Sequence, residues 1–430
     1  MAAHNHHSKL ILQRILGDAE VPELAARFER RSPAEDPLPA RLPGTNDYGA
    51  AALEARRTAL RANGLRIEQL AGRGDEVRPE DLAGNIENFV GFVRVPLGVI
   101  GPLRVIGTHG RGDYFVPLAT TEGALVASYN RGAAAISQSG GAIAVCLGEA
   151  VLRAPCFQFE SLAEAGAFLA HVLPRYDEFQ AAVAETSRHC QLLDLRTSVL
   201  GKEVYLVFEF TTGDASGQNM VTLATAAICR RILESVPVQP AHWYIDGNLS
   251  GDKKATMLAF HSTRGKKVVG EAVLARELVQ ELLHTTPEDM VRYWQVSVLG
   301  GVQSGSIGVQ GHYANALAAL FIATGQDAAT VSEASVGVTR MDVSERGELY
   351  VSVSMPNLIV GTVGGGTALP TARECLAMIG CTGEGSARKL AEICCATALA
   401  GEISIIAAMS HGDFAGAHAR LGRRKKGDAP

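Results

Sequence analysis

Apolar residues recur at helical or strand spacings along most of the chain, and the changes of spacing divide it into regions. Spacings of three and four over residues 22–28 and 48–69 predict amphipathic helices on either side of a proline-rich linker at 32–39. Short β segments are expected within 89–106 and at 114–118, followed by a helix over 124–137. Thr121 is expected to cap that helix, which would place Glu122 in its first turn.

A second pattern begins after Pro155. Helices are predicted over 160–187 and 215–234, and strands over 192–200, 204–211 and 243–245. Helix, strand, strand, helix and strand in this order predict a small α+β unit inserted into a larger domain. The apolar segment 393–409 is interrupted by Glu402, so it is interpreted as a buried core helix rather than a membrane span.

Composition narrows the class of protein. The 430 residues are 47% hydrophobic and 20% charged, which is typical of a globular protein with a large core. A net charge of −5 gives no reason to expect a nucleic-acid partner. The chain has no pattern typical of a signal peptide or a membrane span, so a cytoplasmic location without a membrane partner is expected. Its eight cysteines lack metal-ligand spacing and are expected to be reduced, with no metal site.

The glycine-rich segments do not match the common nucleotide-binding fingerprints. Neither Gly364–Gly366 nor the turn at 383–385 continues as G-x-G-x-x-G, and no Walker loop is present. The predicted strand at 204–210 leads through a glycine turn into a helix start at 212–220. This segment could bind a phosphate at the helix N-terminus, or it could be an ordinary capped turn.

Three ionisable residues lie where they could carry chemistry. Lys253 could belong to a solvated charge cluster, or it could stabilise a developing oxyanion. Asp327 interrupts an apolar stretch, which suggests either a buried partner for a lysine or a helix cap. His418 follows the apolar helix and could be structural or could transfer a proton.

Taken in chain order, the motifs resemble the 3-hydroxy-3-methylglutaryl-coenzyme A reductase family. They are Glu87-Asn88, the segments 95–102 and 116–132, Gly213–Met220, Gly251–Lys254, Gly325–Ala329, Gly361–Thr367 and the histidine near the C-terminus. The resemblance covers roughly residues 85–425 and is to the class I catalytic portion, without the membrane anchor of eukaryotic members.

The resemblance implies an α+β fold and a reductase. It divides the chain into an N-terminal helical region (1–85), a large family-specific α/β domain for substrate and coenzyme A (86–154 and 247–430), and an inserted ferredoxin-like NADP-binding domain (155–246). The implied reaction is the four-electron reduction of hydroxymethylglutaryl-CoA by NADPH to mevalonate and free coenzyme A. Homodimers or homotetramers with active sites at subunit interfaces are also implied.

The resemblance also assigns roles to individual residues. The catalytic set would be Glu122 as proton donor, Lys253 as oxyanion stabiliser, Asp327 as a bridge between them, and His418 as acid to the leaving thiolate. Substrate contacts would come from Arg153, Lys254, Asn315, Ser128, Asn130 and Arg131. Cofactor contacts would come from Ser187, Arg188, Asp214, Gly217, Asn219, Gly364, Gly365, Gly366 and Arg423.

Two residues depart from the family pattern. Asp246 stands where a serine is usual, and its carboxylate would repel an anionic substrate unless it is protonated, turned away or paired with Lys254. Asp413 replaces a commonly basic or neutral residue before His418. Two alternatives therefore stay open: a reductase of the same fold acting on a different acyl-CoA, and a catalytically silent CoA-binding scaffold.

Overall fold

The computed structural model describes residues 6–17, 19–44, 47–74 and 77–412. The strands are β1 (Leu97–Gly107), β2 (Arg111–Ala119), β3 (Ala142–Arg153), β4 (Cys156–Gln158), β5 (Gln191–Leu200), β6 (Glu203–Thr211), β7 (His242–Tyr244), β8 (Gly265–Leu274), β9 (Val338–Val343) and β10 (Leu349–Leu358). The α-helices are α1 (His6–Leu16), α2 (Leu24–Arg27), α3 (Ala50–Ala62), α4 (Leu125–Gln138), α5 (Leu162–Val172), α6 (Tyr176–Thr186), α7 (Gln218–Ser235), α8 (Leu258–His261), α9 (Arg276–Leu278), α10 (Pro287–Ser304), α11 (Tyr313–Thr324), α12 (Val331–Ala334), α13 (Pro370–Met378) and α14 (Ser386–His411).

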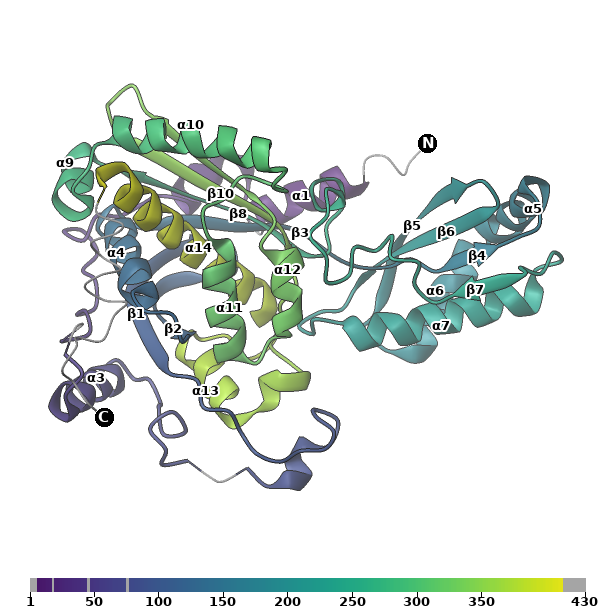
Figure 1. The fold of residues 1–430 in the computed structure, drawn as a ribbon, viewed down its shortest axis with the longest axis horizontal. Coiled ribbons are helices and arrows are strands. Elements are labelled where there is room, and N and C mark those ends of the chain that lie inside the picture. The colour runs from purple at the N-terminus through teal and green to yellow at the C-terminus, as the bar shows by residue number, and fades with distance from the viewer. Residues whose placement is uncertain (1–5, 18, 45–46, 75–76, 413–430) are drawn as a thin grey trace.

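The strands form two lobes: a large lobe with β1, β2, β8, β9 and β10, and a small lobe with β4 to β7. Strand β3 belongs to both lobes. The sheet runs β7-β4-β6-β3-β8-β10-β9, with β1 beside β3, β2 beside β1 and β5 beside β6. Residues 143–150 of β3 pair with β8 in the large lobe, whereas residues 151–153 pair with β6 in the small lobe. The end of β3 lies at the junction between the lobes (Figure 1), and Arg153 is its last residue.

Helix α14 runs through the core of the large lobe, where it packs against α4, α10, α11 and strands β3, β8 and β10 (Figure 1). By length and composition it could cross a membrane, but 83% of its most apolar window is buried inside the protein. The prediction of a buried core helix is confirmed. Glu402 lies within it and is fully buried.

The small lobe has a sheet and a hydrophobic core of its own. Strands β4 to β7 and helices α5 to α7 follow one another as βαββαβ, with antiparallel strand order β5-β6-β4-β7. This connectivity is that of a ferredoxin-like unit. Phe157, Phe168 and Phe208 are buried between the sheet and its helices. The helix expected over 160–187 is divided at Leu173–Arg175, because Pro174 has no N–H for a continuous helix.

Two predicted helix starts are wrong. Helix α4 begins at Leu125 after Ala124, whose φ is 69°, and Thr121 does not cap it. Instead, the Thr120 hydroxyl accepts a hydrogen bond from the Glu122 N–H at 3.0 Å, so Glu122 lies in a turn before the helix. Helix α7 begins at Gln218 rather than Ala215, because Gly217 has a φ of 81°. A Cβ there would lie 2.3 Å from Thr212, so only glycine fits this turn.

Candidate active site

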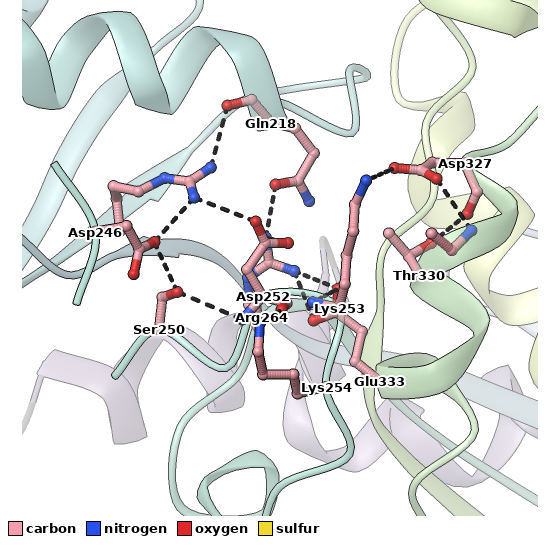
Figure 2. Close-up of polar contacts among 12 residues, drawn as sticks. Gln218, Asp246, Ser250, Asp252, Lys253, Lys254, Arg264, Asp327, Thr330 and Glu333 are labelled. Carbon is pink, nitrogen blue, oxygen red and sulfur yellow. Dashed lines mark hydrogen bonds and ion pairs between the residues drawn. The ribbon is translucent and has the colours of Figure 1, made fainter. Parts of the chain in front are cut away.

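Lys253 and Asp327 form an ion pair beside the junction of the lobes. The Lys253 Nζ lies 2.8 Å from Asp327 Oδ2, with side chains 44% and 37% exposed (Figure 2). Asp327 also caps the short helix η6 (Ala328–Thr330), since its Oδ1 accepts the Ala329 N–H at 3.0 Å. Both of the possibilities open for Asp327, lysine partner and helix cap, are therefore realised, although the pair is partly exposed rather than buried.

Arg153 is buried and meets two carboxylates. Its Nη1 donates to Asp246 Oδ2 at 2.9 Å and to Asp252 Oδ2 at 3.2 Å. Asp246 also accepts from the Ser250 hydroxyl (Figure 2) and from the Asn248 N–H. Asp246 does not pair with Lys254, because the Lys254 Nζ donates to the Asp252 carbonyl oxygen instead. The guanidinium expected to hold a substrate carboxylate thus has protein carboxylates as partners.

Glu122 is one of the residues that line a cavity of about 620 Å³, together with residues of α4, α10, α11 and α14. The Asn315 amide donates to Glu122 Oε2 at 2.7 Å. Among the described residues, no hydrogen bond joins Glu122 to Lys253 or Asp327, so the expected bridge through Asp327 is formed only on its lysine side.

The residues expected on the coenzyme A side separate into two groups. Ser128 and Arg131 line the cavity, and both hydrogen-bond Ser404 of α14. Asn130 does not line it. Its amide oxygen accepts the Gly101 N–H at 3.0 Å and so ties α4 to β1.

The glycine turns expected on the cofactor side lie next to each other. Residue 215 bridges residue 363, and the Thr362 N–H donates to the Asp214 carbonyl oxygen at 2.8 Å. Gly364 and Gly365 have φ of 80° and 54°, with no atom near their missing Cβ positions. Open backbone of this kind beside the N-terminus of α7, where Asn219 is located, suits the close approach of a phosphate.

Asp214, which the resemblance places on the cofactor side, binds the start of a helix. Its two carboxylate oxygens accept the N–H groups of Gly385 and Ala387, each at 2.8 Å, and so cap the start of α14. Ser187 and Arg188 follow α6 on the small lobe, where the Arg188 Nε donates to the His189 ring. His418, Arg423 and Asp413 lie outside the described residues.

Comparison with known proteins concerns the chain as a whole. The profile of the family described as hydroxymethylglutaryl-coenzyme A reductase matches residues 52–423. The 3-hydroxy-3-methylglutaryl-coenzyme A reductase of Pyrococcus abyssi is 42% identical over 382 residues, which cover 86% of this chain and 93% of that protein. The one from Aeropyrum pernix is 46% identical over 347 residues, covering 79% and 82% of the two chains. The chain belongs to the hydroxymethylglutaryl-coenzyme A reductase family.

The fold of the family is also found at low sequence identity. The class II 3-hydroxy-3-methylglutaryl-CoA reductase from Streptococcus pneumoniae, solved bound to NADPH, superposes with a TM-score of 0.68 at 19% identity. The match covers 83% of this chain and 96% of the bacterial one. It shows that this family member has the reductase fold.

Several residues of the site were not foreseen from the sequence. Arg264 and Glu333 form a buried ion pair beneath Lys253 (Figure 2). Glu402 and His312 also line the cavity, and Glu402 accepts hydrogen bonds from the N–H groups of Gly311 and His312. Only Glu402 gave a signal in the sequence, as the one charged residue of the apolar segment 393–409. Arg264 and Glu333 gave no such signal, because in a sequence a buried charged residue outside an apolar segment cannot be told from a charged residue on the surface.

Proposed function

We propose that this protein is an NADPH-dependent reductase that converts hydroxymethylglutaryl-CoA to mevalonate and free coenzyme A. The Lys253–Asp327 ion pair carries the proposal, because it places an ammonium group, held by a carboxylate, in a chain that belongs to this family. Two equivalents of NADPH and two protons balance the reaction, and NADPH supplies the hydride in each reduction.

The chain's own residues account for the charges that develop. The Lys253 ammonium would stabilise the negative oxygen formed when a hydride reaches the thioester or aldehyde carbon. Glu122 would give the aldehyde oxygen its proton, and because Oε2 accepts from Asn315, the proton to be transferred would be on Oε1. His418 would protonate the thiolate of coenzyme A as it leaves.

We assign coenzyme A and the dinucleotide to two different surfaces. Ser128 and Arg131 would contact coenzyme A along the cavity, together with Ser404. The glycine turns at 213–217 and 364–366 would hold the dinucleotide phosphates, with Ser187, Arg188, Asn219 and Arg423 nearby. Asp214 would support this site by capping α14 rather than by touching the cofactor.

The experiment compares substrates and cofactors one at a time. NADPH oxidation should accompany the release of free thiol from hydroxymethylglutaryl-CoA, with a slower rate for NADH. His418→Gln should slow thioester reduction far more than reduction of supplied mevaldehyde, because the aldehyde has no thiolate to expel. Failure of the wild-type protein to oxidise NADPH with hydroxymethylglutaryl-CoA would reject the proposal.

A second function is favoured by one observation, the pairing of Arg153 with Asp246 and Asp252. If this guanidinium does not release its carboxylates, the same machinery would act on an acyl-CoA without a terminal carboxylate. Rates on a panel of acyl-CoAs would separate the two functions. A silent CoA-binding scaffold is disfavoured, because it would have no chemical use for the Lys253–Asp327 pair.

We further propose a cytoplasmic homodimer or homotetramer, without a nucleic-acid or membrane partner. The apolar side chains of Val296, Leu299 and Val302 are exposed along one face of α10, next to Tyr293, Trp294 and Ser297, which line the cavity. Burial of this face by a second copy would close the cavity from one side.

A further inference from the structure

The backbone of Lys253 is in a conformation that a lysine does not adopt without support. Its φ is 57°, in the left-handed region. We propose that Glu333, held by Arg264, is a positioning residue that keeps Lys253 in this conformation and thereby aims its ammonium group. This proposal rests on the proposed function, in which Lys253 stabilises the oxyanion.

Both backbone polar groups of Lys253 are bound by α12. The Lys253 N–H donates to Glu333 Oε1 at 3.0 Å, and the Ser332 hydroxyl donates to the Lys253 carbonyl oxygen at 2.8 Å. Asp327, which pairs with the ammonium, lies six residues before Glu333 on the same continuous turn and helix. One segment, 327–333, thus holds Lys253 at its carbonyl oxygen through Ser332, and at its N–H and Nζ through Glu333 and Asp327 (Figure 2).

Glu333 can act in this way because it is itself fixed. Its side chain is fully buried, and both carboxylate oxygens accept from Arg264 Nη1, whose side chain is 2% exposed. Burial raises the pKa of the Glu333 carboxyl, while the Arg264 guanidinium and the Lys253 N–H oppose that rise. Its hydrogen bonds with Arg264 and with the Lys253 N–H fix the orientation of the Glu333 carboxylate.

Arg264 also holds the residue before Lys253. Its Nη2 donates to Asp252 Oδ1 at 2.7 Å and to Gln218 Oε1 at 2.6 Å (Figure 2). Gln218 is the first residue of α7, the helix whose N-terminus borders the glycine turns of the proposed cofactor site. The buried guanidinium consequently connects the start of this helix, the loop before Lys253 and the glutamate beneath it.

The kinetic test uses Glu333→Gln, which removes the charge with little change of shape. Displacement of a catalytic group by about 1 Å can cost up to about 100-fold in rate. We expect kcat to fall at least about tenfold, with KM for hydroxymethylglutaryl-CoA and NADPH within about twofold of wild type. Ser332→Ala, at an exposed site, should lower kcat about threefold without unfolding the protein.

The control is Asp113→Asn, which neutralises another carboxylate paired with a buried arginine; the Asp113 side chain is 16% exposed. Asp113 accepts from Arg104 Nε and Nη2 at 2.8 and 2.9 Å, between β1 and β2. This variant should keep the wild-type kcat. A kcat in Glu333→Gln equal to that of the control would overturn the proposal, as would a loss expressed only in KM.

A second measurement does not depend on turnover. Amide hydrogen exchange in the loop 247–257 should accelerate in Glu333→Gln and in Ser332→Ala, and stay at the wild-type rate in Asp113→Asn. If the wild-type protein proves inactive, the proposed function fails, but this exchange still decides whether Glu333 holds the loop. Unchanged exchange in both variants would reject the positioning role.

Discussion

In the proposed mechanism, both reductions depend on one ammonium group, that of Lys253, whose Nζ lies 2.8 Å from the Asp327 carboxylate. Asp327 keeps the charge of Lys253 in place, while the partial exposure of the pair leaves the ammonium within reach of a carbonyl oxygen. In that mechanism an oxyanion would form in both reductive steps, so the same ammonium group would act twice. Few other residues can therefore compensate for its loss.

Lys253→Ala should abolish reduction of the thioester and of the aldehyde alike. Loss of one well-placed electrostatic donor typically costs about 10²–10³-fold in turnover. Initial rates with hydroxymethylglutaryl-CoA and with mevaldehyde check this expectation. Near-normal rates on either substrate would remove Lys253 from that step.

Asp246 should weaken the binding of an anionic acyl group, because it occupies the guanidinium of Arg153. Asp246→Asn keeps the shape of the side chain but lowers its competition with a substrate carboxylate. A hydrogen bond to a charged group contributes about 1.5–3 kcal/mol, so KM for hydroxymethylglutaryl-CoA should fall by roughly tenfold. Steady-state kinetics measure this. An unchanged KM would mean that Arg153 does not receive the substrate carboxylate.

For individual residues of the site, the sequence predicted which residue types are present better than it predicted their hydrogen-bond partners. Lysine and aspartate at 253 and 327 were expected to meet, and they do. The partner of Asp246 was missed because Arg153 is far away in sequence and is brought to it by the end of β3. The contacts of Asp214 with the start of α14 were also not foreseen, because that helix begins 172 residues later in the sequence.

Among the elements, α14 places an ionisable side chain, that of Glu402, in the buried core, where an unpaired charge would be unfavourable. Burial raises the pKa of Glu402, but hydrogen bonds from the His312 side chain and from the N–H groups of Gly311 and His312 outweigh it and hold the pKa below its ordinary 4.5. Thr339 also donates to this carboxylate at 2.7 Å. The helix is thus connected to the start of α11 by charge-assisted hydrogen bonds.

A group whose pKa is lowered by folding stabilises the protein above its unfolded pKa, and this contribution is lost as the pH falls through the folded value. Glu402→Gln should cost about 1–3 kcal/mol of unfolding free energy near pH 7. The difference from wild type should shrink below about pH 4.5. Urea unfolding at a series of pH values measures it. A difference that stays constant down to pH 3 would contradict the ionised state of Glu402.

Most helices and strands were predictable, because the spacing of their apolar residues is a local property of the sequence. The errors lie at helix starts that depend on a single backbone φ angle. The strands at 192–200 and 204–211 were found to within a residue as β5 and β6. The starts of α4 and α7 were misplaced because Ala124 and Gly217 adopt positive φ. An alanine gives no sequence signal for such a turn, since the conformation is imposed by the surrounding structure.

In the whole molecule, two hydrophobic cores share one strand, and the proposed site lies where that strand passes between them. Arg153, Gln218 and Arg264 bring side chains from both lobes into one hydrogen-bonded network at this junction. A sequence can indicate that an insertion exists, but contacts across the junction follow only from the packing of both parts.

The last prediction concerns the exposed face of α10. Val296, Leu299 and Val302 are 62%, 68% and 70% exposed and lie three residues apart, on one side of the helix. If a second copy covers this face, Leu299→Asp would place a charge in an apolar interface at a cost of several kcal/mol.

Light scattering should then show a particle of monomer mass for Leu299→Asp, with strongly reduced reductase activity, because the neighbouring cavity would lose its covering partner. Leu162→Asp is the matched control, since Leu162 is 64% exposed at the start of α5 in the small lobe, where a negative charge is favourable. It should keep the wild-type mass and rate. An oligomer that persists in Leu299→Asp would show that α10 does not form the interface, and dissociation without loss of activity would show that each chain has a complete active site.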